Sequence, residues 1–122
     1  MGDEGFEYSP GYEWNENGRL IGIYWPDCNI KGSVSFEKFP ELKKIVCYNN
    51  QLSSLDVSKN AELTLLECHG NKLGHLDVSP NTALTYLACD GNNLSSLDVT
   101  NNKKLDYLEY DEDQVKVIGW KK

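Results

Sequence analysis

Apolar residues recur along most of this chain at a fixed interval of 21 residues. Leu42 to Glu62 reads LKKIVCYNNQLSSLDVSKNAE, and LTLLECHGNKLGHLDVSPNTA from Leu63 and LTYLACDGNNLSSLDVTNNKK from Leu84 follow without a gap. The shared pattern is L-x-x-(L/I)-x-C-x-x-N-x-L-x-x-L-D-V-(S/T)-x-N-x-x. Self-similarity at such a period is typical of a solenoid, in which each repeat forms one coil.

Two weaker copies flank these three repeats. A truncated copy begins at Leu105, with Asp113 at the asparagine position and apolar or aromatic residues at Leu108, Tyr110, Val115, Ile118 and Trp120. An upstream copy matches the pattern at Leu20, Ile23, Trp25, Cys28 and Ile30. We therefore expect about five coils between Leu20 and Trp120.

The alternation within each repeat predicts the course of one coil. Positions 4 and 6 are apolar and alternate with polar or variable residues, which predicts a short strand with one buried face. One coil buries too little apolar surface by itself, so neighbouring coils must stack at ~4.8 Å around a shared core. On the return side, leucine and valine point inward, and we expect short extended or 3-10 segments. The aspartates of LDV then point outward; we call them the convex aspartates, Asp56, Asp77 and Asp98.

The ends of the chain contain cap-like segments. YEWNENGRL, from Tyr12 to Leu20, predicts a β-hairpin with an Asn17-Gly18 turn. VKVIGW supplies apolar residues, with Trp120 last, to cover the final coil. We expect one structural domain, with a lead and hairpin cap over residues 1–19 and a repeat region over residues 20–122.

The first eleven repeat positions resemble the leucine-rich repeat, L-x-x-L-x-L-x-x-N/C-x-L, with cysteine replacing the third leucine. This resemblance implies an α/β-type solenoid, mostly β, with a right-handed coil and a parallel concave sheet. The LDVSxN segment with cysteine at position 6 is similar to the short repeats of internalin-like bacterial cell-surface and secreted proteins. That similarity implies a protein-binding module of a larger protein, located outside the cell or on its surface.

Cysteines and asparagines also recur at the same spacing. Cys47, Cys68 and Cys89 form what we call the cysteine column. Parallel side chains ~4.8 Å apart do not match a disulfide, whose Cβ atoms lie ~3.8 Å apart, so we expect buried free thiols. The asparagine ladder, Asn50, Asn71 and Asn92, should satisfy backbone groups where the chain leaves the strand. Cys28 occupies this position in the first coil.

The adjacent Cys68 and His69 raise the question of a metal or nucleophilic site. Zinc needs about four converging ligands. His69, however, should face outward while Cys68 faces the core, and His75 should lie across the coil. The sequence therefore predicts no metal, no cofactor and no catalytic set, and hence a non-enzymatic protein.

Charge and hydropathy restrict the partners. With 12 basic and 19 acidic residues the net charge is -7, which disfavours nucleic acid. No apolar run approaches the ~18 residues of a membrane-spanning helix, so we expect no membrane insertion. We expect a monomer.

A binding surface is predicted on the concave face, where the sequence varies while the scaffold repeats. This candidate face comprises Tyr24, Lys44, Val46, Tyr48, Leu65, Glu67, His69, Tyr86, Ala88, Asp90, Tyr107, Glu109 and Asp111. Exposed tyrosines beside carboxylates suit protein recognition. One alternative is carbohydrate binding, with Tyr48, Tyr86 and Tyr107 as stacking platforms and carboxylates as hydroxyl acceptors. Another is a structural spacer whose tyrosines only stack across strands.

Overall fold

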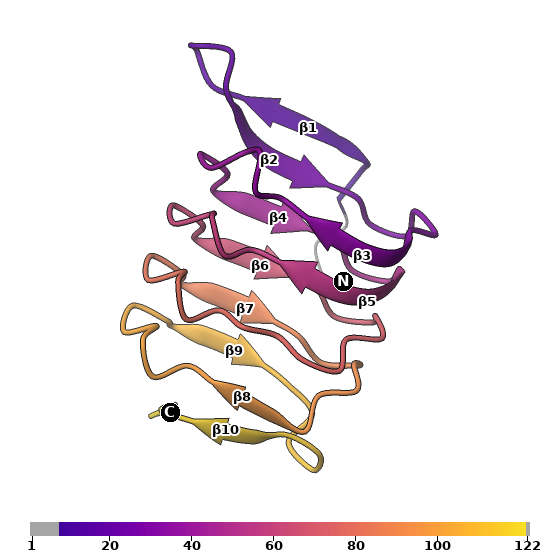
Figure 1. Cartoon of the computed structure of the whole chain (residues 1–122), viewed down its shortest axis with the longest axis vertical. Coiled ribbons are helices and arrows are strands. Elements are labelled where there is room, and N and C mark those ends of the chain that lie inside the picture. Colours follow the sequence, from indigo (N-terminus) through magenta and orange to yellow (C-terminus); the bar gives the residue numbers. More distant parts are fainter. Residues whose placement is uncertain (1–7, 122) are drawn as a thin grey trace.

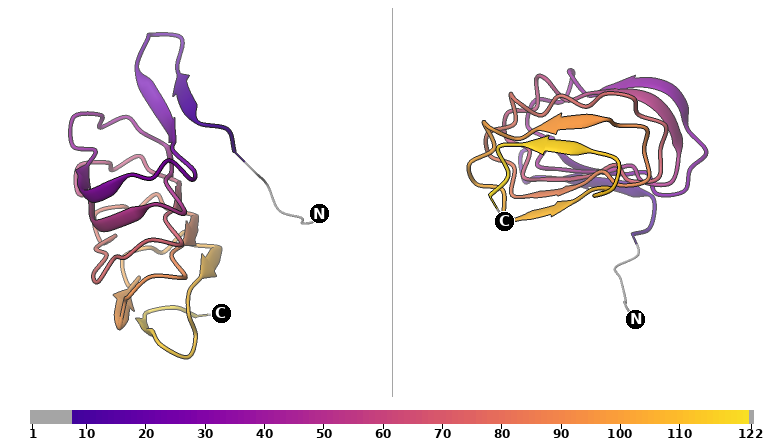
Figure 2. Two further views of the ribbon diagram at one scale, coloured as in Figure 1. Left: turned by 90° about the vertical axis from the view of Figure 1, so that its right-hand side faces the viewer. Right: turned by 90° about the horizontal axis from the view of Figure 1, so that it is seen from below.

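The repeats form a stack of β-coils, which the computed structural model describes over residues 8–121. Ten strands are β1 (Gly11–Trp14), β2 (Leu20–Tyr24), β3 (Lys31–Ser35), β4 (Lys44–Val46), β5 (Gln51–Asp56), β6 (Leu65–Glu67), β7 (Tyr86–Ala88), β8 (Ser96–Asp98), β9 (Tyr107–Glu109) and β10 (Lys116–Ile118). Viewed along the stack, successive coils superpose (Figure 2). The described residues contain no helix long and apolar enough to cross a membrane.

One side of the stack carries a six-stranded sheet in the order β1-β2-β4-β6-β7-β9, which we call the main sheet (Figure 1). Its strands from β2 to β9 are parallel. The centre of the pairing joins Ile45 to Leu66, Leu87 and Leu108 in turn, which is the 21-residue spacing of the sequence. The parallel β-solenoid predicted from the repeat is therefore confirmed.

The hairpin of β1 and β2 forms the amino-terminal edge of the main sheet. These two strands pair antiparallel, with Tyr12 opposite Ile23. At the turn, the Gly18 N–H donates to the Asn15 carbonyl at 3.0 Å, and Gly18 has a φ of 78° that glycine adopts easily. The hairpin therefore continues the sheet beyond the first parallel strand.

The opposite side of the coils is irregular, with two short parallel sheets, β3-β5 and β10-β8. Leucine and valine of the LDV segments point into the core: Leu76 and Val78 are buried, as are their equivalents in the neighbouring repeats. The Asp77 carboxylate accepts hydrogen bonds from the Ser79 N–H at 2.9 Å and the Ser79 hydroxyl at 2.7 Å. Each convex aspartate caps the turn that follows it.

Asparagine side chains join the coils in the turn after each main-sheet strand. The Asn71 Oδ1 accepts from the Leu52 N–H at 3.0 Å, while its Nδ2 donates to the carbonyls of Cys47 and Cys68, both at 3.1 Å. Asn50 and Asn92 make equivalent bonds. In the first coil, the Cys28 thiol donates to the Pro26 carbonyl at 3.3 Å.

A second set of asparagines lies on the return side, and the sequence reasoning assigned it no role. The Asn81 Nδ2 donates to the carbonyls of Val57 and Asn60, both at 2.9 Å, and Asn60 and Asn102 bond in the same way. All three side chains are buried. Their signal was visible in the sequence as the last invariant asparagine of the repeat.

The last coil departs from the expected register. Val117, and not Ile118, pairs with Leu97, and Ile118 is 45% exposed. Asp113, predicted at the asparagine position, is also exposed. The Gln114 Nε2 donates instead to the carbonyls of Asn92 and Leu94, at 3.3 and 3.0 Å. The final copy is therefore one residue shorter than the 21-residue repeat.

Candidate functional site

The candidate site is the outer face of the main sheet, to which each strand contributes the residues flanking its buried central residue. The pairing places Lys44, Leu65, Tyr86 and Tyr107 in one row across the sheet. Tyr24, Val46, Glu67, Ala88 and Glu109 form a second row. The rows follow from the period of two along each strand, which turns alternate side chains to opposite faces.

Aromatic rings pair along this face. Tyr86 and Tyr107 stack with ring centroids 4.3 Å apart and an interplanar angle of 14°. Tyr48 stacks on His69 at 4.6 Å and 12°. Such pairs of facing rings hold the side chains in fixed orientations. Tyr107 remains 41% exposed, so its stack with Tyr86 is open to a partner.

Carboxylates surround the Tyr86–Tyr107 stack. The Tyr107 hydroxyl donates to Glu109 Oε1 at 2.8 Å, and this bond is the main reason why the pKa of Tyr107 is raised. Burial raises the pKa of Glu67 and of Asp90, and nearby Glu109 raises both further. The predicted acidic end of the face is thus a group of carboxylates that repel one another.

Two polar atoms in this region are buried without a hydrogen-bond partner among the described residues: His69 Nδ1 and Asp90 Oδ1. Burying a polar atom without a partner costs about 1–3 kcal/mol. Asp111 has a structural contact, because its Oδ2 accepts from the Gly91 N–H at 2.8 Å. Acceptor and donor capacity therefore remains unused near His69 and Asp90.

Three residues predicted for the exposed face are buried, which corrects the sequence-based surface. Val46 is 0%, Ala88 1% and Tyr48 8% exposed. Val46 and Ala88 are small side chains paired with larger residues on both neighbouring strands, Ala88 between Glu67 and Glu109. Tyr48 is covered by the His69 ring on one side. The remaining predicted residues are exposed or half-buried.

The cysteine column lies on the inner side of the same sheet. Its three thiols are buried, and all four cysteines of the chain are free. Burial raises the pKa of Cys47 and of Cys89 to about 12, and that of Cys68 well above its ordinary value. No group of three or more His, Cys, Asp or Glu side chains within residues 8–121 is arranged to hold a metal ion.

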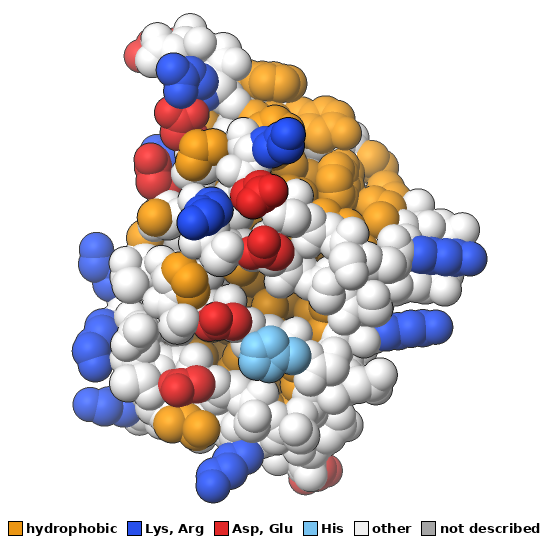
Figure 3. Space-filling view, in the orientation of Figure 1, with side chains coloured by type: hydrophobic (Ala, Val, Ile, Leu, Met, Phe, Trp, Pro, Cys, Tyr) orange, Lys and Arg blue, Asp and Glu red, His pale blue; other side chains and the backbone are white. Residues whose placement is uncertain are grey.

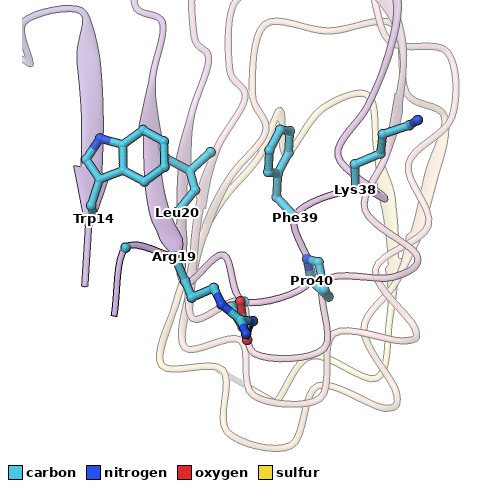
Figure 4. A pocket seen from close by; sticks show the side chains of 8 residues that line it. Trp14, Arg19, Leu20, Lys38, Phe39 and Pro40 are labelled. Atoms are coloured by element: carbon cyan, nitrogen blue, oxygen red, sulfur yellow. Dashed lines mark hydrogen bonds and ion pairs between the residues drawn. The ribbon is translucent and has the colours of Figure 1, made fainter. Parts of the chain in front are cut away.

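A pocket lies away from the main sheet, at the amino-terminal end of the stack. Trp14, Leu20, Phe39 and Pro40 line it, and Arg19 beside it pairs with Glu41 at 2.6 Å (Figure 4). Apolar side chains gather at this end of the molecule, over β1 to β3 (Figure 3). The polar groups at the pocket are already paired with each other, so the pocket lacks the convergent free polar groups of a specific ligand site.

Comparison with known proteins identifies a relative of this arrangement. No family model and no curated protein matches the chain. Among solved structures, the functional domain of InlJ from Listeria monocytogenes, described as including a cysteine ladder, matches with a TM-score of 0.65 and 32% identity. The match covers 68% of this chain and 18% of that chain.

Proposed function

Because the chain is a leucine-rich-repeat solenoid that resembles an internalin, we propose that it is a non-enzymatic module that binds a protein partner through the main sheet. The likeness to the InlJ domain supports a protein-interaction module in general. The proposal further places the chain within a larger bacterial surface or secreted protein.

The observation that carries this proposal is the open tyrosine pair among unpaired carboxylates. Tyr86 and Tyr107 present a rigid aromatic surface, with Glu67 and Glu109 on the neighbouring row. A tyrosine offers large contact area and a polar tip at low entropy cost, which suits the centre of a protein interface. The buried, unpartnered Asp90 Oδ1 gives this region an acceptor for a donor group of the partner.

The structure favours a protein over a carbohydrate at this face. The proposed sugar platform uses Tyr48, which is 8% exposed and has one ring face against His69. A sugar stacks on an open ring face, and Tyr48 does not offer the surface that the platform requires. The remaining pair, Tyr86 and Tyr107, is one continuous patch.

The test compares binding of the chain to arrays of extracellular proteins and of glycans. The double variant Y86S/Y107S removes the stack, and the matched control Y12S removes a tyrosine that is 57% exposed on β1. We expect a protein hit that the double variant loses and the control keeps, with thermal unfolding used to verify that each variant is folded. A hit on glycans alone would favour carbohydrate binding. Absence of any hit would favour the structural spacer.

A further inference from the structure

The described chain begins with a residue that lies on the candidate face. The Tyr8 ring stacks on Tyr24, with centroids 5.3 Å apart and an interplanar angle of 24°. The Tyr8 N–H donates to the Tyr48 hydroxyl at 3.4 Å, and the Tyr8 hydroxyl is hydrogen-bonded to Glu67. One tyrosine therefore contacts three successive coils.

These contacts recognise distinct parts of a tyrosine residue. Tyr24 meets the aromatic ring, the Tyr48 hydroxyl accepts from the backbone, and the Glu67 carboxylate accepts from the phenol. Burial and the proximity of Glu67 raise the pKa of the Tyr8 phenol, so it remains a hydrogen-bond donor at neutral pH. A hydrogen bond to an ionised carboxylate is roughly twice as strong as a neutral one. A phenylalanine would keep only the ring contact.

The segment that carries Tyr8 is extended. Residues 8 and 9 belong to no strand or turn, and Pro10 restricts the residue before it to extended conformations. The strand β1 begins at Gly11, so the tether between Tyr8 and the sheet is short. A short tether gives an effective concentration in the millimolar range, so contacts that are weak between separate molecules suffice within one chain.

We propose that Tyr24, Tyr48 and Glu67 form a tyrosine subsite of the binding face, which accepts a tyrosine from an extended segment of a protein partner and which Tyr8 occupies in the free chain. The partner in this statement rests on the proposed function. A partner must displace Tyr8, so its apparent affinity falls by the fraction of the chain in which the subsite is filled. The open Tyr86–Tyr107 stack lies toward the other end of the same sheet and provides the first contact.

The test uses the full-length chain with Y8A, which vacates the subsite without altering a repeat. The probe is the acetylated and amidated peptide GFEYSP, residues 5–10, titrated into isotope-labelled protein while NMR resonances are followed. We expect shift changes at Tyr24, Tyr48 and Glu67 in Y8A, and a half-saturating peptide concentration at least about threefold higher in the unmodified chain, where Tyr8 competes. A peptide with phenylalanine in place of tyrosine should bind more weakly than GFEYSP.

A matched pair of carboxylates isolates the hydroxyl contact. In the Y8A chain, E67Q should weaken binding of GFEYSP by roughly tenfold, the value of one charge-assisted hydrogen bond. E109Q, at the same repeat position two coils away, should leave it unchanged. Equal binding of GFEASP and GFEYSP, or shift changes confined to Tyr86 and Tyr107, would overturn the subsite.

Other outcomes separate this inference from the proposed function. Peptide binding by Y8A together with empty arrays would support the subsite and contradict a protein partner on the arrays. A protein hit combined with no peptide binding would support the proposed function and overturn the subsite. A concentration-dependent dimer that Y8A abolishes would show that the occupant is Tyr8 of a second copy, and would overturn the assignment to a different protein.

Discussion

Replacing Asn71 with alanine tests whether the asparagine ladder holds the coils together. Asn71 is 7% exposed, and its amide makes three hydrogen bonds of 3.0 to 3.1 Å. Alanine would leave the Leu52 N–H and the carbonyls of Cys47 and Cys68 without these partners. Each lost bond that leaves a buried group unpaired costs about 1 kcal/mol or more, so N71A should lower the free energy of unfolding by about 3 kcal/mol.

Urea unfolding followed by circular dichroism measures this loss. With a urea dependence of about 1–3 kcal/mol per molar, 3 kcal/mol moves the midpoint down by at least about 1 M at an unchanged slope. The control is N93A in the same turn: Asn93 is exposed, and alanine keeps the backbone N–H that donates to the Leu73 carbonyl at 2.9 Å. N93A should stay within about 0.5 kcal/mol of the unmodified chain. Equal stabilities of N71A and N93A would refute the energetic role of the ladder.

Three further predictions concern the thiols, one turn and the pH dependence. A thiol reagent should modify at most Cys28 in the folded chain and all four cysteines in denaturant, because the cysteine column is buried; rapid native reaction of two thiols would contradict this. G70A should lower the unfolding midpoint, since Gly70 has a φ of 69° and an added Cβ would clash with a neighbouring side chain, whereas G74A should not, because nothing lies within 4 Å of its added Cβ. Burial raises the pKa of Glu67 and of Asp90, so their ionisation weakens folding above the raised values and this penalty disappears as pH falls below their ordinary values. The convex aspartates have lowered pKa values and stabilise the fold above their ordinary value of 3.8, losing this contribution as pH falls through the lowered values. Stability should therefore rise from pH 7 to roughly 5 and decline below roughly 4, and urea midpoints that fall steadily from pH 7 would disagree.

The repeat made much of the fold predictable because it encodes interactions between neighbouring coils. An interval of 21 residues fixes which residue pairs with which, so the Ile45, Leu66, Leu87 and Leu108 row could be read from the sequence. The same interval stacks the ladder asparagines and the cysteine column. Local pattern and coil-to-coil contact agree here, and both depend only on sequence spacing.

The surface was less predictable because exposure depends on the sizes of neighbouring side chains. Alternation correctly turned Val46, Tyr48 and Ala88 away from the inner row, yet all three are buried. Flanking residues on adjacent strands and the stacked ring of His69 cover them. Period-two patterning gives the direction of a side chain and carries no information on what lies above it.

What the sequence determined by itself is the solenoid, its strand spacing and its inward residues, because every repeat restates the same local and nearest-neighbour preferences. Tertiary structure alone decided the features that occur once. The shortened last coil shifts Val117 into the place predicted for Ile118, and Gln114 replaces an asparagine. Tyr8 lies on Tyr24 and beside Glu67, 59 residues further along the chain, and no repeat pattern links them. Such contacts arise only when folding brings distant segments together.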